Sequence, residues 1–266
     1  MKIHIILNTH IKELIKKHFF IYKIFHWCLR NLPFVIKQFI YPHEYDYYIL
    51  RNLKIKKIKI LDIGGGTGES IISFYNINKN ITVDTYEPNR NNYKFCLKLK
   101  KKYKELTVHN YAYGSNKIKR KLQIPVLNNY RLDNLSGFKK KDIIENIKVN
   151  FFIKKINFLE QKVEYSKNDK KYNFIKIDCE TNFLDTVKSL SDNFSSNTII
   201  MIETNYEIKN IYEYLKKKND TYRGYYYLDG ILEKINNYNS KTVSKIVLNK
   251  KIKNILFLNK NVFKKK

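Results

Sequence analysis

The stretch "KIKILDIGGGTGES", Lys57–Ser70, decides how the rest of the chain is interpreted. Its apolar residues up to Ile63 predict a buried strand, the three glycines that follow predict a tight turn, and the polar residues after them predict the start of a helix. Turns of this kind hold several different cofactors, because the backbone amides at the start of the helix face a negatively charged group. The spacing of the glycines decides which cofactor fits.

Two familiar phosphate-binding patterns do not fit this turn. A P-loop requires a Lys-Ser or Lys-Thr pair after its last glycine, but Glu69 and Ser70 stand there. A dinucleotide fingerprint, G-x-G-x-x-G, that begins at Gly64 would place its third glycine at Glu69. The pattern that fits is acid-x-G-x-G-x-G, formed by Asp62, Gly64, Gly66 and Gly68.

This spacing favours S-adenosylmethionine as the cofactor. Glycines let the backbone approach the methionine moiety closely, and Asp62 puts a negative charge near the expected position of its ammonium group. The ribose needs an acceptor at the end of the second strand, about 20 residues further on, and Glu87 stands there. The alternative is a purely structural turn, with Glu87 at an exposed strand end.

Strand and helix patterns alternate from Lys57 onward, which predicts a doubly wound, mostly parallel α/β sheet with an antiparallel closing strand. Asn89 is the expected N-cap of the second helix, and Thr204 with Glu207 is expected to form a capping box. Residues 115–170 are irregular, with short strands expected at 120–126 and 149–159. The remaining strands are expected at 57–63, 81–87, 106–112, 173–178, 198–203, 224–230 and 253–259, and the helices at 67–75, 89–103, 182–190 and 206–218.

The chain divides into a basic amphipathic helical extension, residues 1–52, and a cofactor-binding domain, residues 53–266. The helix of the extension either packs on the domain or lies on an anionic membrane. No signal peptide and no membrane span is predicted, and Cys28, Cys96 and Cys179 form no paired motif. We therefore expect a cytoplasmic protein, with peripheral membrane contact through residues 1–50 as an open possibility.

The net charge of +28 suggests either a polyanionic partner or a lysine-rich genome bias. The lysines are spread over every segment of the chain and form no single stripe. Arginine, which reads bases and grips phosphates with its planar fork, is scarce. Both observations favour the bias and disfavour a nucleic-acid partner.

Several motifs beyond the glycine turn resemble those of FkbM-type S-adenosylmethionine methyltransferases. "ILDIGGGTGES" is similar to the first motif of that family, "YEPNRNNYKF" to the second, and "HNYAYGS" to the segment after the third strand. "FIKIDCETNFLDTVKSL" is similar to the family's Lys-Ile-Asp-Val-Glu-Gly strand and helix, although Thr181 replaces the usual glycine. The resemblance runs from about Ile58 to Lys260 and implies a Rossmann-like class I methyltransferase fold. It also implies that Pro88 and Ala112 contact the cofactor.

Catalysis in such a sheet is expected beyond the carboxyl ends of the first and fourth strands. Asp178 is the first candidate for the base that accepts the proton of a hydroxyl acceptor, and Glu180 and His109 are lesser candidates. The alternative role for Asp178 is to cap the helix that follows. A metal held by Asp178, Glu180 and Glu203 is conceivable, but none is assigned, and Cys179 is expected to point into the core.

The sequence therefore predicts an S-adenosylmethionine-dependent O-methyltransferase. The resemblance implies that its acceptor is a hydroxyl of a glycan or another small molecule. Two alternatives stay open: an RNA methyltransferase, which the high positive charge would suit, and a non-catalytic protein that binds membranes through residues 1–50.

Overall fold

The structure is a computed structural model, and it describes most of the chain after residue 43. The predicted extension helix within residues 1–41 and the candidate base Glu180 lie outside the described residues. The described segments are 44–114, 120–127, 129–151, 156–179, 183–190, 193–204, 207–228, 230–239 and 253–259, together with positions 42, 242, 243, 246 and 262.

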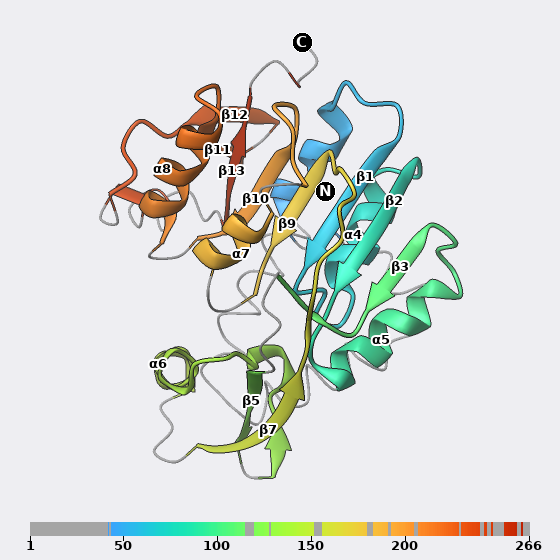
Figure 1. The fold of residues 1–266 in the computed structure, drawn as a ribbon, viewed down its shortest axis with the longest axis vertical. Helices are drawn as coiled ribbons and strands as arrows, with labels where there is room; N and C mark the ends of the chain where they lie inside the picture. The colour runs from blue at the N-terminus through green and yellow to red at the C-terminus, as the bar shows by residue number, and fades with distance from the viewer. Residues whose placement is uncertain are drawn as a thin grey trace.

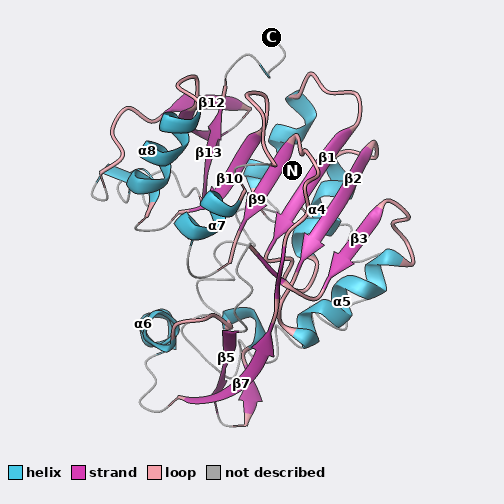
Figure 2. Ribbon diagram, viewed as in Figure 1, coloured by secondary structure: helices cyan, strands magenta, loops and turns pink. Residues whose placement is uncertain are grey.

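A mixed sheet forms the centre of the molecule (Figures 1 and 2). Its strands are β1 Ile58–Ile63, β2 Ile81–Tyr86, β3 Leu106–His109, β9 Phe174–Ile177, β10 Ile199–Glu203, β11 Arg223–Leu228, β12 Ile231–Lys234 and β13 Asn254–Leu258. They lie side by side in the order β12-β11-β13-β10-β9-β1-β2-β3. The pairs β10–β9, β9–β1, β1–β2 and β2–β3 are parallel, whereas β13 runs antiparallel to both β10 and β11. The predicted doubly wound sheet with an antiparallel closing strand is confirmed.

Helices cover both faces of this sheet because its strands are apolar on both sides. Along β10, Ile199 and Met201 pack into one core cluster, and Ile200 and Ile202 pack into a second cluster on the opposite face. The first cluster is closed by α4, Glu69–Ile77, and α5, Arg90–Lys100. The second is closed by α7, Phe183–Ser189, and α8, Ile208–Lys218.

The short 3-10 helix η1, Tyr45–Asn52, also belongs to the first core cluster. The ring of Tyr47 meets that of Phe74 on α4 edge-to-face, with centroids 5.3 Å apart, and Ile49 and Leu50 are fully buried. The domain boundary predicted from the sequence places these residues in the N-terminal extension, but they pack as part of the central fold.

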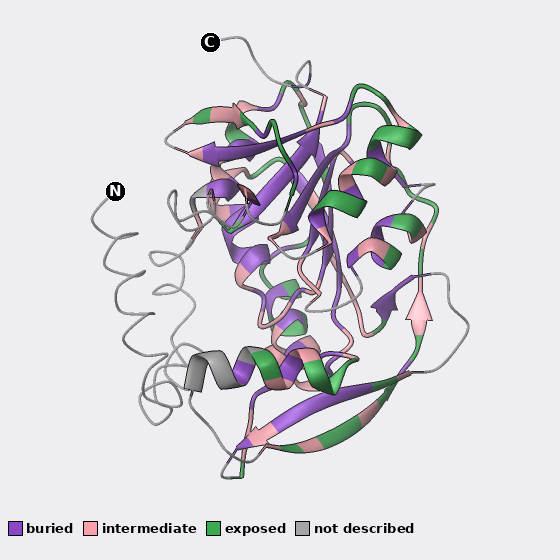
Figure 3. Ribbon diagram, turned by 90° about the vertical axis from the view of Figure 1, so that its left-hand side faces the viewer, coloured by how far each residue is buried: buried purple, intermediate pink, exposed green. Residues whose placement is uncertain are grey.

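A long insertion between β3 and β9 forms a separate small layer, drawn in the lower part of Figure 1. It contains β4 Ala112–Tyr113, β5 Arg120–Leu127, β6 Tyr130–Arg131, η2 Asp133–Leu135, α6 Lys140–Phe151, β7 Asn157–Val163 and β8 Tyr165–Ser166. Strand β5 pairs antiparallel with β6 and β7, and β4 pairs with β8. Strand β7 of this small sheet is largely exposed, whereas its neighbour β5 is mostly buried (Figure 3).

Two local predictions were wrong. The apolar run at 149–159 was expected to be one strand, but α6 extends through its start and β7 begins only at Asn157. Ile143 and Ile147, one helical turn apart, are both buried and anchor this helix. The capping box is absent: α8 begins with Glu207 as its N-cap without a side-chain cap, and Glu207 Oε2 instead accepts a hydrogen bond from the Leu184 amide, 3.2 Å away.

Candidate active site

A cavity of about 240 Å³ opens where the carboxyl ends of β1, β2 and β9 meet the insertion. The chain runs from β1 through β2 to β3 on one side of β1 and continues with β9 and β10 on the other. The cavity therefore lies at the point where strand order reverses, the usual ligand site of doubly wound sheets. Its wall combines the glycine turn, the end of β2, the segment around Asp178 and several residues of the insertion.

The glycine turn presents bare backbone to this cavity. Gly64 has a φ of +85°, and a Cβ there would lie 1.8 Å from the Asp178 carbonyl oxygen. Gly66 has a φ of +52°, and a Cβ there would meet nothing within 4 Å. Both glycines line the cavity. The lack of a side chain at Gly64 permits close packing against Asp178, and its lack at Gly66 leaves room for a ligand. Gly68 does not line the cavity; it abuts Leu99 and caps the start of α4.

Glu87 follows β2 and points back at the glycine turn. Its Oε2 accepts a hydrogen bond from the Gly66 amide at 2.7 Å, and its Oε1 accepts one from the Asn89 amide at 2.8 Å. The side chain is buried and lines the cavity, so it is not an exposed strand end. Burial raises the pKa of Glu87 to about 8, although the two amide bonds oppose this shift.

Lys176 on β9 forms ion pairs with two carboxylates, that of Asp62 beneath the glycine turn and that of Asp178 beside it. Its Nζ donates a hydrogen bond to Asp178 Oδ2 at 3.0 Å and lies 3.6 Å from Asp62 Oδ1. Burial opposes the positive charge, but the charges of Asp178 and Asp62 outweigh it and raise the Lys176 pKa well above its usual range. This lysine therefore stays protonated. It connects Asp62, which lies beneath the turn, to Asp178, which lines the cavity.

Asp62 does not reach the cavity. Its side chain is fully buried beneath the turn, where Oδ2 accepts hydrogen bonds from Ser70 at 2.8 Å and from Thr85 at 3.0 Å. The predicted direct contact between Asp62 and a ligand ammonium group does not follow from this geometry. Asp62 supports the turn from below and shares the charge of Lys176.

The other predicted contact residues are brought together. Pro88 and Ala112 line the cavity with Gly64, Gly66 and Glu87. Asp178 lines it as well, with 38% of its side chain exposed, and its amide bonds to the Ile63 carbonyl at the end of β1. The turn, the end of β2 and the candidate base thus face one space.

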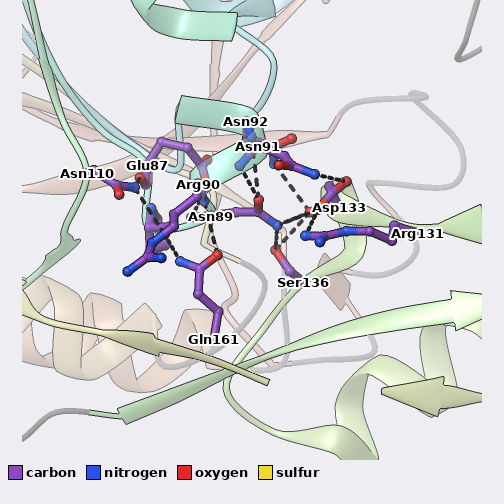
Figure 4. A network of polar contacts seen from close by, with 11 residues as sticks. Glu87, Asn89, Arg90, Asn91, Asn92, Asn110, Arg131, Asp133, Ser136 and Gln161 are labelled. Carbon is purple, nitrogen blue, oxygen red and sulfur yellow. Dashed lines mark hydrogen bonds and ion pairs between the residues drawn. The ribbon is translucent and has the colours of Figure 1, made fainter. Parts of the chain in front are cut away.

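A polar network fastens the insertion to the start of α5 (Figure 4). Asp133 on η2 is buried, and its Oδ1 accepts hydrogen bonds from Asn89 Nδ2 at 3.0 Å and from Arg131 at 2.8 Å. Asn91 Nδ2 donates to the other oxygen at 3.3 Å. Asn89 is also the N-cap of α5, as predicted, because its side chain accepts from the Asn91 and Asn92 amides. One asparagine therefore links Glu87, α5 and the insertion.

The sequence indicated neither Lys176 nor Asp133 as site residues. Lys176 had a visible signal, since a lysine inside the otherwise apolar stretch "NFIKID" must find negative partners when the strand is buried. Asp133 had none, because the polar segment "NNYRLDNLSG" that contains it is typical of an ordinary surface loop.

Three further residues were considered in the sequence: His109 as a candidate base, Cys179 as a core residue and Glu203 as a metal ligand. His109 does not line the cavity; it stacks on Tyr86 with ring centroids 4.4 Å apart, and burial lowers its pKa. Cys179 packs against the second core cluster, as predicted, but also lines the cavity. Glu203 ends β10 and does not line the cavity.

The described residues contain no group of three or more His, Cys, Asp or Glu side chains that could hold a metal ion. Within the same residues, no helix combines the length and the apolar character that a membrane crossing requires. Neither observation extends to residues 1–41 or to Glu180.

Comparisons with known proteins add fold-level similarities. No protein-family model matches the sequence, and no curated protein matches it either. Among solved structures, the plantazolicin methyltransferase BpumL, crystallised with S-adenosylhomocysteine, is 12% identical with a TM-score of 0.41, over 83% of this chain and 80% of that one. The precorrin-6y C5,15-methyltransferase of Geobacter metallireducens is 11% identical with a TM-score of 0.38, over 78% and 81%.

Coclaurine N-methyltransferase is 12% identical with a TM-score of 0.34, and the match spans 59% of this chain and about a third, 34%, of that enzyme. At such values the similarities carry no inference about substrate or activity. The fold class is given by the strand order itself: β3-β2-β1-β9-β10-β13-β11, with β13 antiparallel, is the Rossmann-like arrangement of class I methyltransferases.

Proposed function

We propose that this protein is an S-adenosylmethionine-dependent O-methyltransferase. The observation that carries the proposal is the pairing of Glu87 with the Gly66 amide at the rim of a cavity that no side chain of the turn fills. Glu87 occupies the Gly66 amide that a pyrophosphate would otherwise use, whereas its remaining acceptor positions can take the hydroxyl hydrogens of a ribose.

The cavity residues suit the donor in two respects. Gly64 and Gly66 offer a strip of backbone without side chains, against which a bulky ligand can lie closely. Each Glu87 oxygen accepts one amide bond, and a carboxylate has about four acceptor positions in all, so both oxygens keep capacity for ribose hydroxyls. When bound, S-adenosylmethionine supplies a methyl group activated by its positive sulfur.

Asp178 is the residue proposed to receive the proton of the acceptor. It faces the cavity, and the hydrogen bond from Lys176 occupies only part of its acceptor capacity. Asp178 would accept the hydroxyl proton of the acceptor when that oxygen takes the methyl group and the carbon–sulfur bond of the donor breaks, which would leave neutral S-adenosylhomocysteine. Lys176 fixes the orientation of that carboxylate and balances its charge until the proton arrives.

The finer proposal is membership of the FkbM type, with a glycan or small-molecule hydroxyl as the acceptor. It rests on the motifs around Asp62, Glu87 and Asp178. It also rests on the insertion between β3 and β9, several residues of which line the cavity. Glu180 keeps its predicted role as a second carboxylate near the acceptor.

Titration calorimetry with S-adenosylmethionine, S-adenosylhomocysteine and NAD tests the proposal. We expect both sulfur nucleosides to bind and NAD not to bind. At pH 9, where Glu87 with its pKa of about 8 is mostly ionised, Glu87→Gln removes a charged acceptor and should weaken nucleoside binding by about 2 kcal/mol, or roughly 30-fold. Glu105→Gln is the matched control, because Glu105 is exposed and pairs only with Lys57 on the surface.

Two results would contradict the proposal: binding of NAD in preference to the sulfur nucleosides, or equal nucleoside affinity in Glu87→Gln and the wild type. The O-methyl product is then tested by transfer of a labelled methyl group from the donor into a glycan extract. The labelled linkage should be stable to base. Pretreatment of the extract with nuclease separates this activity from RNA methylation.

A further inference from the structure

The insertion contributes an aromatic wall to the cavity. Phe138 and Tyr165 both line it, with ring centroids 5.8 Å apart and ring planes within 28° of each other. Tyr165 also lies against Gly114, where a Cβ would stand only 3.0 Å from its ring. Both rings are partly exposed and line the cavity. Aromatic walls of this kind bind flat or ring-shaped groups.

A guanidinium group stands beside this wall. Arg120 lines the cavity, and its Cζ lies 5.9 Å from the centroid of the Tyr165 ring. Burial raises the pKa of Tyr165, and the nearby charge of Arg120 opposes that shift. The ring and the cation therefore form one surface.

Among the described residues that line the cavity, only Arg120 and Lys176 are cations. Lys176 is committed to Asp62 and Asp178. Among the described residues, no carboxylate forms an ion pair with Arg120, whereas Arg131 forms one with Asp133. Arg120 bonds to Tyr165 and faces a cavity that also contains carboxylates, of which Asp185 acts on the same tyrosine. The remaining donors of its guanidinium group can take an anion that comes from outside the chain.

We propose that the wall of Arg120, Phe138 and Tyr165 is an acceptor subsite for a ring that carries a carboxylate. This inference rests on the proposed function, because the wall faces the same cavity as Asp178 and the glycine turn. The planar fork of arginine pairs with a carboxylate through two parallel hydrogen bonds, and the aromatic rings hold the face of the acceptor ring. One available guanidinium balances one carboxylate; a dianionic phosphate would call for a second cation.

The carboxylate-bearing ring can belong to an acidic sugar or to an aromatic acid, and paired probes distinguish these sources. Methyl glucuronide is compared with methyl glucoside, and 4-hydroxybenzoate with 4-hydroxybenzamide, so that each pair differs only in the charged group. Binding to the full chain is measured by ligand-observed NMR titration, with and without S-adenosylhomocysteine. The titration without nucleoside keeps the subsite measurable even where donor binding fails.

We expect the acidic member of at least one pair to bind at least tenfold more tightly than its neutral partner. Arg120→Gln should abolish that preference, and Arg120→Lys should restore it only in part, because lysine keeps the charge but loses the fork. Arg51→Gln is the control: Arg51 also lies over a tyrosine ring, 4.6 Å from the Tyr48 centroid, but is exposed and outside the cavity.

Equal binding of acidic and neutral probes in both pairs overturns the inference, and so does an acid preference that survives in Arg120→Gln. Absence of binding by all four probes also overturns it. Nucleoside affinity of each variant is measured in parallel, so a folding defect is recognised by its loss. Loss of nucleoside binding in the wild type would instead overturn the proposed methyltransferase function.

Discussion

The two halves of the cavity are built in different ways. The donor half consists of backbone amides and buried carboxylates at the ends of β1 and β2, with Glu87 held by two amide bonds. The acceptor half consists of side chains from a small separate sheet, such as Arg120 and Tyr165. Backbone geometry restricts what the first half can bind, whereas side chains of the second half can be replaced without a change in the strand order of the main sheet. On the proposed function, the first half would bind the donor and the second half would bind the acceptor.

The largest expected effect comes from Lys176, which supports the donor half. Lys176→Met leaves Asp62 and Asp178 without their shared cation and should lower the free energy of unfolding by about 3–5 kcal/mol. Urea denaturation measures this loss. Lys59→Met, an exposed lysine on β1, serves as the control and should change stability little. Equal stability of the two variants would show that the buried ion pairs do not support the fold.

Asp133 links the two halves, and its removal should have the next largest effect. Asp133→Asn weakens the hydrogen bonds from Asn89, Asn91 and Arg131 and should cost about 1–3 kcal/mol. Hydrogen exchange should show faster opening of the insertion than of the central sheet. Asp169→Asn, an exposed change in the same insertion, should have no such effect. Uniform loss of protection over the whole chain would contradict a specific role at the junction.

Substitutions at Gly66 and Gly64 should distinguish an effect on ligand binding from an effect on folding. Gly66→Ala puts a methyl group into the open cavity, so we expect nucleoside affinity to fall about tenfold while stability falls by about 1–2 kcal/mol. Gly64→Ala drives a methyl group into the Asp178 carbonyl and should prevent normal folding. Calorimetry and thermal melting distinguish the two results. Unchanged affinity in Gly66→Ala would mean that the donor does not lie against the turn.

The smallest expected effect is the pH dependence of donor binding. Glu87 has a pKa raised to about 8, so its carboxylate form becomes more abundant as the pH rises from 7 to 9. Because the ionised form is the better acceptor for ribose hydroxyls, nucleoside affinity should increase several-fold over this range. The dependence should vanish in Glu87→Gln. Affinity that falls with rising pH would exclude the ionised carboxylate as the binding form.

The donor half could be predicted from the sequence because local patterns determine it. The strand before Ile63, the glycine spacing and the N-cap at Asn89 are all short-range signals, and each element forms within a few residues of its expected bounds. Asp62 and Gly68 were the exceptions, because neither lines the cavity although both were predicted to contact the cofactor. Whether the Asp62 carboxylate faces a ligand or a buried lysine depends on β9, more than 100 residues further along the chain.

The acceptor half could not be predicted because its contacts are long-range and its local signals are ambiguous. The run 149–159 contains apolar residues that fit either a strand or a helix, and the helix formed because Ile143 and Ile147 find a common core. Arg120 and Tyr165 are far apart in sequence and meet through the pairing of β5 with β7 and of β4 with β8. Phe138 reaches them through the isolated bridge between Gln123 and Gly137. No short motif encodes that arrangement.

The pairing of β4 with β8 has a consequence for how this protein changes over evolutionary time. Ala112 and Tyr165 are neighbours across the two strands, so the insertion leaves and rejoins the main chain path at one place. The two strands run parallel, so a crossover of at least about a dozen residues must connect them, and a simple turn cannot replace it. A crossover of another length or sequence can still be accommodated without a change in the strand order of the central sheet. On the proposed function, a change of acceptor would then require replacement of this segment and not of the glycine turn.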